Sequence, residues 1–148
     1  MLKRLFAMAL IVALPVRAAD VPGGLQAWEE DPARIFDASE VELDEFLWAA
    51  RPLVVFANSE RDPAFEDQME SIFAEIDLLV DRHVVLITDT DPGGRSALRR
   101  RLRPRGFMLA LIGKDGEVKL RKPLPWTVRE LNRSIDKMPM RQRELRER

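Results

Sequence analysis

The stretch from residue 51 to residue 91 constrains the fold most, because two short apolar runs flank one amphipathic segment. The runs, 53–57 and 84–88, are rich in β-branched residues, which is typical of strands buried on both faces of a parallel sheet. Between them apolar residues recur at helical spacing: Phe65, Met69, Ile72, Phe73, Ile76, Leu79 and Val80. The pattern predicts a β-α-β unit with one helix, whose apolar side, including Phe73, packs on the sheet.

The second half of the chain predicts a short helix, a hairpin and a closing helix. Residues 95–102 are half basic, with only Ala97, Leu98 and Leu102 apolar, and predict a helix on the surface. Residues 107–112 are apolar and predict a third strand. A Gly-Lys-Asp-Gly turn then leads into the alternating residues 117–121, which is typical of a β-hairpin. Thr127 and Glu130 form a capping box for a closing helix with one apolar stripe: Val128, Leu131, Ile135 and Met138.

This order, β-α-β-α-β-β-α, predicts an α/β fold with a central four-stranded mixed sheet flanked by helices. Residues 51–138 form the predicted domain. Residues 19–50 are expected to be an irregular arm followed by a short helix, which Ser39 and Glu42 begin as a capping box and Arg51-Pro52 ends. Phe46 and Leu47 should face inward. Residues 139–148 are expected to be a basic tail with little to bury.

Residues 1–18 have the features of a secretory signal peptide. Lys3 and Arg4 precede an apolar run, residues 5–16, which ends at the small residues Ala18 and Ala19. The run is shorter than the about 20 apolar residues that span a bilayer, so we expect cleavage after Ala18 and no transmembrane anchor afterwards. The expected location is the periplasm or the medium.

The chain contains no cysteine, which excludes disulfides, thiol redox chemistry and cysteine metal ligands. Its charges are unevenly distributed: residues 20–91 hold 4 basic and 19 acidic residues, and residues 92–148 hold 17 basic and 6 acidic. Such a division indicates either a polar molecule or two half-chains that neutralise each other when they pack.

Several segments resemble a known family: Arg51–Ala57, Gly106-Phe107, Leu111–Gly116, Val118–Arg121 and Met138–Arg141. They are similar to a bacterial family catalogued as domain of unknown function 4174, whose relatives occur in animal extracellular proteins beside sushi repeats. The resemblance covers most of the chain after the signal peptide and implies a thioredoxin-like, peroxiredoxin-like fold. It brings no established reaction.

The thioredoxin active-site chemistry is not expected here. In thioredoxins the two thiols follow the first core strand, and the matching positions are Arg61 and Ala64, or Glu60 and Pro63. Ser59 lacks a base, because the only histidine, His83, should lie at the opposite end of the sheet. We therefore predict no catalytic residue and no cofactor, and expect Ser59 and Asp62 to cap a helix that begins at Pro63.

Polar residues follow the first two predicted strands, at the edge where open α/β sheets bind ligands. This candidate ligand edge contains Asn58, Ser59, Glu60, Asp62, Asp89 and Asp91. Its oxygen atoms suit Ca²⁺ or Mg²⁺, but no ligand loop of fixed spacing is present, so no metal site is predicted. The sequence favours a binding or accessory module with an unknown ligand. The alternative is an enzyme that uses carboxylates or a metal at this edge.

The densest run of one charge surrounds the second helix: Arg95, Arg99, Arg100, Arg101, Arg103 and Arg105. Because the apolar stripe of this helix is thin, most of these guanidinium groups are expected to face water. One interpretation is a solvated face that the acidic half of the chain partly neutralises. The other is docking of an anionic partner, a protein or lipid head groups. Nucleic acid is not expected, given the signal peptide and the acidic total.

Overall fold

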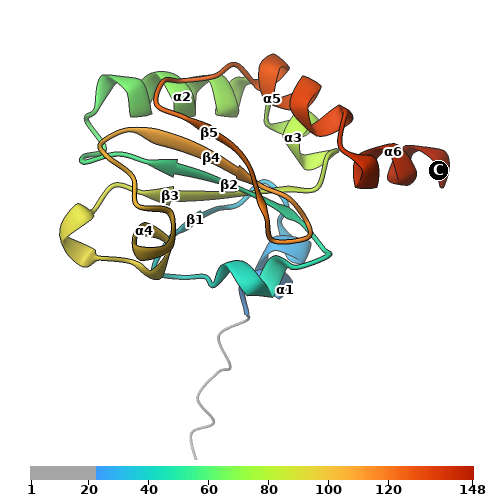
Figure 1. Ribbon diagram of the computed structural model, residues 1–148, viewed down its shortest axis with the longest axis horizontal. Helices are drawn as coiled ribbons and strands as arrows, with labels where there is room; N and C mark the ends of the chain where they lie inside the picture. The colour runs from blue at the N-terminus through green and yellow to red at the C-terminus, as the bar shows by residue number, and fades with distance from the viewer. Residues whose placement is uncertain (1–22) are drawn as a thin grey trace, which may run out of the picture.

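The computed structural model describes residues 23–148, so the predicted signal peptide lies outside the described residues. Five strands form one mixed sheet in the order β1-β3-β2-β4-β5 (Figure 1). Their bounds are β1 Ile35–Asp37, β2 Arg51–Phe56, β3 Val84–Asp89, β4 Met108–Ile112 and β5 Val118–Lys122. Strands β1 and β2 run parallel to β3, whereas β4 runs antiparallel to β2 and β5. The α/β class and the hairpin are confirmed, and β1 makes a fifth strand where four were expected.

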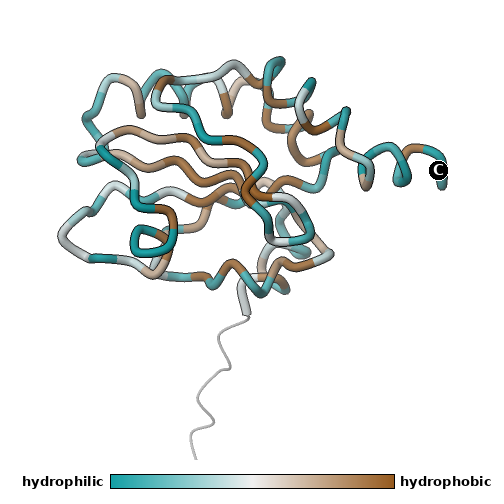
Figure 2. The backbone as a smooth tube through the Cα atoms, viewed as in Figure 1, coloured by the Kyte–Doolittle hydropathy of each residue, from teal (hydrophilic) through white to brown (hydrophobic). Residues whose placement is uncertain are grey.

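Helices cover both faces of the sheet. Helices α2 (Pro63–Ala74), α3 (Ile76–Val80) and α5 (Val128–Asp136) pack on one face. Helix α1 (Gly24–Glu30), the 3₁₀ turn η1 (Leu43–Phe46) and helix α4 (Ala97–Leu102) pack on the other. Successive residues of β2 serve the two cores alternately, since Leu53 and Val55 contact one and Val54 and Phe56 the other. The central strands β2, β3 and β4 are largely hydrophobic along the trace, whereas the edge strand β5 contains several hydrophilic residues (Figure 2).

The central helix buries the predicted face except at Phe73, but it is shorter than predicted. It ends at Ala74, and a separate helix follows from Ile76. Phe73 was expected in the core but is 58% exposed, and Gln68 takes the inward position instead. Gln68 is fully buried because its amide exchanges two 2.8 Å hydrogen bonds with the backbone of Trp126, and a buried amide needs such partners.

The segment before β2 also differs from its prediction. The expected irregular arm contains α1 and β1. Ser39 caps no helix: its hydroxyl donates to Asp37, and the capping box is formed by Glu42 and Glu45 at η1. Leu47 was expected to face inward but is 38% exposed.

The chain ends in a helix rather than a tail. The capping box of Thr127 and Glu130 begins α5 as predicted. Residues 139–148 were expected to bury little, but they contain helix α6 (Pro139–Arg146), whose Arg141 is only 2% exposed. Figure 1 shows α6 extending from one end of the sheet. Within residues 23–148, no helix has the length and apolar content that crossing a membrane requires.

Candidate functional site

The predicted ligand edge is divided in the structure. Asp89 and Asp91 border a cleft of about 420 Å³ together with Asp37 and Glu40 from the segment around β1. Asn58, Ser59, Glu60 and Asp62 are not among the residues that line it. Asp62 instead accepts a 2.9 Å hydrogen bond from the Ala64 amide and caps α2, and the Ser59 hydroxyl accepts one from the Arg61 amide in the preceding turn.

The carboxylate of Asp89 is occupied by hydrogen bonds from side chains of the same domain. Its carboxylate accepts a 2.7 Å hydrogen bond from Arg99 Nε and a 2.5 Å hydrogen bond from the Ser96 hydroxyl. The Arg99 guanidinium also donates to the carbonyl of Ala57, so it joins the ends of β2 and β3 to α4. Among residues 23–148, no three His, Asp or Glu side chains lie close enough to hold a metal ion. The described edge therefore holds a structural ion pair.

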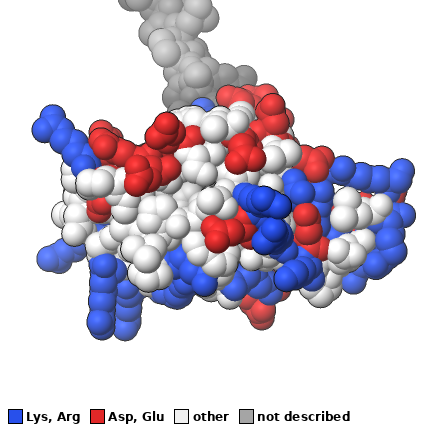
Figure 3. All heavy atoms as spheres, turned by 90° about the horizontal axis from the view of Figure 1, so that it is seen from above, with Lys and Arg blue, Asp and Glu red and all other residues white. Residues whose placement is uncertain are grey.

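Of the six arginines of the predicted anion-binding patch, one is withdrawn from solvent by an ion pair and five stay exposed. The Arg99 side chain is 9% exposed because of its pair with Asp89, and Arg101 lies 3.8 Å from Asp44. Arg101 is nevertheless exposed, and so are the other four: Arg95, Arg100, Arg103 and Arg105. Both pairs join the basic half of the chain to the acidic half, as the neutralisation hypothesis expects. Figure 3 shows basic side chains at the end where α6 lies, at the opposite end and along the lower edge of the view.

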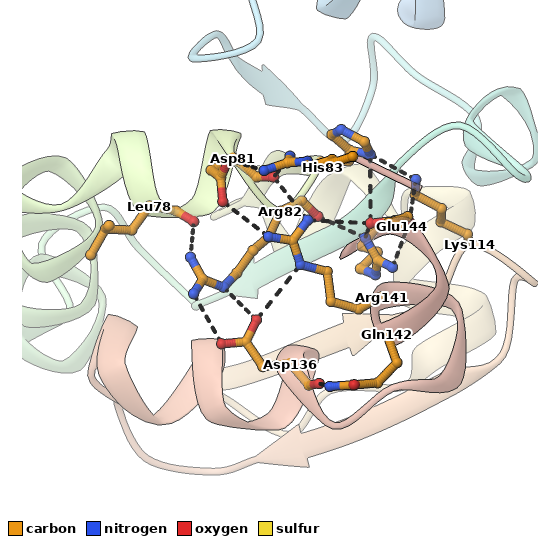
Figure 4. A network of polar contacts seen from close by, with 11 residues as sticks. Leu78, Asp81, Arg82, His83, Lys114, Asp136, Arg141, Gln142 and Glu144 are labelled. Carbon is orange, nitrogen blue, oxygen red and sulfur yellow. Dashed lines mark hydrogen bonds and ion pairs between the residues drawn. The ribbon is translucent and has the colours of Figure 1, made fainter. Parts of the chain in front are cut away.

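A second cluster, which sequence analysis missed, lies at the opposite end of the sheet. It joins the start of β2, the start of β3, the turn after β4, and α6 (Figure 4). The Glu144 carboxylate is held by two cations: Arg51 Nη2 at 2.9 Å and Lys114 Nζ at 2.7 Å. Arg51 is 1% exposed and Lys114 is 7% exposed. Two nearly buried cations from separate elements thus meet at one carboxylate. We call these two residues, Arg51 and Lys114, together with the adjoining His83, the cation cluster.

His83 opens β3 at the end of the sheet opposite Ser59, as predicted. Its Nδ1 lies 2.7 Å from Lys114 Nζ. An ammonium group can only donate, so Nδ1 accepts and the imidazole is neutral. Burial, followed by the nearby charge of Lys114, lowers the pKa of His83. The histidine therefore acts here as a hydrogen-bond acceptor for a buried cation.

A second layer of ion pairs surrounds this cluster. Arg141 pairs with Asp81 at 2.9 Å and contacts Glu144 at 3.3 Å. Arg82 pairs with Asp136 of α5 at 2.9 Å. A hydrogen bond from Arg148, together with the charges of Arg148 and Arg141, outweighs the opposing effect of burial and lowers the pKa of Asp81. These pairs connect the two C-terminal helices to the loop before β3.

Two strained residues adjoin the cation cluster. Trp48 and His83 have positive φ angles of 64° and 53°, a region that a bulky residue such as tryptophan rarely adopts. The Trp48 amide donates to the carbonyl of Lys114, and the carbonyl of His83 accepts from the Arg51 amide, both at 2.7 Å. Backbone strain of this kind is concentrated at functional sites.

A cavity of about 210 Å³ opens beside the cluster. Its walls are Arg51, Gly113, Lys114, Asp115, Lys119, Met138, Pro139 and Met140. Each of these residues belongs to one of the segments through which the sequence resembles its family. Segments that are distant along the chain therefore converge on one cavity, and their convergence is the signal that could have located the site.

The ionisation of Glu144 gives a pH test of the cluster. Burial acts to raise the pKa of Glu144, but hydrogen bonds and charges of Arg51 and Lys114 outweigh it and lower the pKa to about 2 from 4.5. A lowered carboxyl pKa stabilises the fold above the unfolded value, and this contribution is lost as pH falls towards the folded one. Glu144→Gln should cost about 3 kcal/mol at pH 6, and the gap to wild type should close between pH 4.5 and pH 2. Urea unfolding of both proteins across this pH range measures the difference in free energy of unfolding. A difference that does not change with pH would contradict the lowered pKa of Glu144.

Comparison with known proteins agrees with this architecture. The fold is thioredoxin-like: the chain is similar to Prx1a of Plasmodium yoelii, a peroxiredoxin, with a TM-score of 0.54 and 17% identity over 70% of this chain and 82% of the other. The model of the domain of unknown function DUF4174 matches residues 42–144. The chain belongs to that family. A search of curated proteins gives no match.

Proposed function

We propose that the chain is an exported, cysteine-free thioredoxin-like binding module that takes an anionic ligand at the cation cluster. The observation that carries this proposal is the cavity of about 210 Å³ bordered by two nearly buried cations, Arg51 and Lys114. Arginine and lysine in such a setting bind carboxylate or phosphate oxygens strongly, because burial reduces the competition from water.

Stability alone is a weak reason for such a cluster. A buried ion pair costs desolvation that often cancels its attraction, and apolar residues of similar size commonly stabilise a core as well. Here two cations surround one carboxylate and an open cavity lies beside them. This arrangement supports an anion-binding role over a purely structural one.

The alternative, a carboxylate- or metal-dependent enzyme at the other edge of the sheet, has less support. Its central residue, Asp89, is occupied by Arg99 and Ser96. The candidate edge residues also separate between the cleft and the α2 cap. The cation cluster therefore remains the better candidate.

Anion titration followed by NMR tests the binding proposal directly. Acetate and phosphate should shift the amide resonances around Arg51, His83 and Lys114, whereas chloride at the same ionic strength should not. Lys114→Met should abolish these shifts, and Lys137→Met, which removes an exposed lysine, should retain them. Shifts that are equal in chloride, or that persist in Lys114→Met, would contradict the proposed site.

Export is tested separately through the mature N-terminus. When the full chain is expressed in a bacterium with a general secretion system, we expect a periplasmic product that begins at Ala19. Mass spectrometry of the intact product gives this end directly. An uncleaved chain that stays in the cytoplasm would refute export without affecting the binding site.

A further inference from the structure

We infer that Glu144 is an internal ligand of the cation cluster and that an external carboxylate replaces it as helix α6 swings away. This inference rests on the proposed function and adds the class of ligand and the way in which the site opens. The cation cluster binds a carboxylate group, that of Glu144. A small aliphatic carboxylate in solution carries the same group.

The contacts of Glu144 are those expected of a bound carboxylate. Arg51 approaches both oxygens, with Nη2 at 2.9 Å from Oε1 and Nη1 at 3.3 Å from Oε2. This is the two-pronged geometry by which arginine recognises carboxylates. Lys114 donates to Oε1 at 2.7 Å. Arg51 and Glu144 are 93 positions apart in the chain. The two cations lie on the sheet and on its turn, whereas the carboxylate lies on the terminal helix.

Helix α6 is docked mainly through charges. Arg141 is its one buried residue, and its Leu145 is 45% exposed. Glu144 and Arg141 supply the helix's ion pairs to the body of the domain, and Arg148 adds a further pair with Asp81. Since the only buried residue of α6 is charged, the free energy that opposes its release is chiefly that of these ion pairs. A competing carboxylate restores the partner that Arg51 and Lys114 would otherwise lose.

The neighbouring cavity favours a carboxylate with a short apolar chain. Besides the two cations, its walls combine the apolar Met138, Pro139 and Met140 with Gly113, Asp115 and Lys119. Met138 and Pro139 lie at the junction of α5 and α6, where the helix would turn. A ligand such as butyrate would place its carboxylate on the cluster and its alkyl chain against Met138, which precedes α6 and packs on the core of the domain.

The first experiment measures release of the helix in the wild-type protein. Amide hydrogen exchange is compared in sodium butyrate and in sodium chloride at the same pH and ionic strength. Exchange in residues 139–146 should accelerate severalfold in butyrate, while α5 stays protected. Equal exchange of α6 in the two salts would overturn the replacement of Glu144.

The second experiment tests whether the vacated cluster accepts a carboxylate. Glu144→Ala should melt at a lower temperature than wild type in chloride and recover most of the loss in butyrate, because a ligand of the native state stabilises it. Glu147→Ala makes the same charge change at the end of the same helix and should gain no more from butyrate than wild type does. Rescue by phosphate but not by butyrate would overturn the ligand class.

The two experiments separate the inference from the function on which it rests. Rescue of Glu144→Ala without release of α6 in wild type leaves the anion site standing and overturns the internal-ligand mechanism. Absence of both effects overturns the mechanism and the site together. If Glu144→Ala does not fold in either salt, hydrogen exchange of wild type decides the mechanism and the Lys114→Met titration decides the site.

Discussion

Asp89→Ala should destabilise the protein by about 3–5 kcal/mol, because it leaves the guanidinium group of Arg99 buried without its anion. The two side chains are 4% and 9% exposed, and Arg99 also lies 5.5 Å from the ring centroid of Phe56. Loss of the pair loosens the ends of β2 and β3 and the helix that follows. The free energy of unfolding, measured with urea at pH 7, gives the effect.

Asp91→Ala is the matched control for this prediction. Asp91 lies two residues away on an exposed turn, so the substitution should cost less than about 0.5 kcal/mol. If both variants lose the same free energy, the effect reflects general charge at this edge and not the buried pair.

Ile72→Ala should cost about 2–5 kcal/mol, whereas Phe73→Ala, one residue further on, should cost less than about 1 kcal/mol. Ile72 is fully buried against the sheet, and Phe73 is 58% exposed. The two substitutions share a helix, so the same unfolding measurement separates burial from helix propensity. A larger loss for Phe73→Ala would restore the helical face that periodicity alone predicts.

Periodicity predicted the strands and the class of fold because buried parallel strands and alternating hairpins have strong patterns. The position of the hairpin, the cap at Thr127 and the helix start at Pro63 follow from local chemistry and are confirmed. The central helix was placed correctly, and its predicted apolar face is wrong only at Phe73, which is exposed, while Gln68 was missed as a buried residue. Gln68 is buried through hydrogen bonds to Trp126, 58 residues away, and no local pattern reports such a partner.

The short strand β1 was missed for a related reason. Only three residues pair, and they pair with β3, which lies far along the chain. Their tendency to form a strand is therefore supplied by tertiary contact. A strand of this length between turns gives little periodicity to detect.

The cation cluster could not be assembled from spacing. Arg51 stood at a helix-to-strand boundary, Lys114 in a turn signal, and Glu144 in an apparent basic tail. Each of the three residues had an ordinary local explanation. The contact between Arg51 and Glu144 depends on how α6 packs near the start of β2. Only the segments of family resemblance connected two of these residues before the structure did.

The two outer strands determine how this sheet meets other chains. An exposed strand edge offers unpaired backbone groups to any extended peptide, and proteins limit that risk with short or charged edge strands. Here β1 ends one side after three residues, and β5 ends the other with Lys119, Arg121 and Lys122 among its five. Under the export that we propose, the chain would cross the membrane unfolded and then fold without a disulfide to lock it. The short edge strand β1 and the positively charged edge strand β5 disfavour edge-to-edge aggregation while the chain folds.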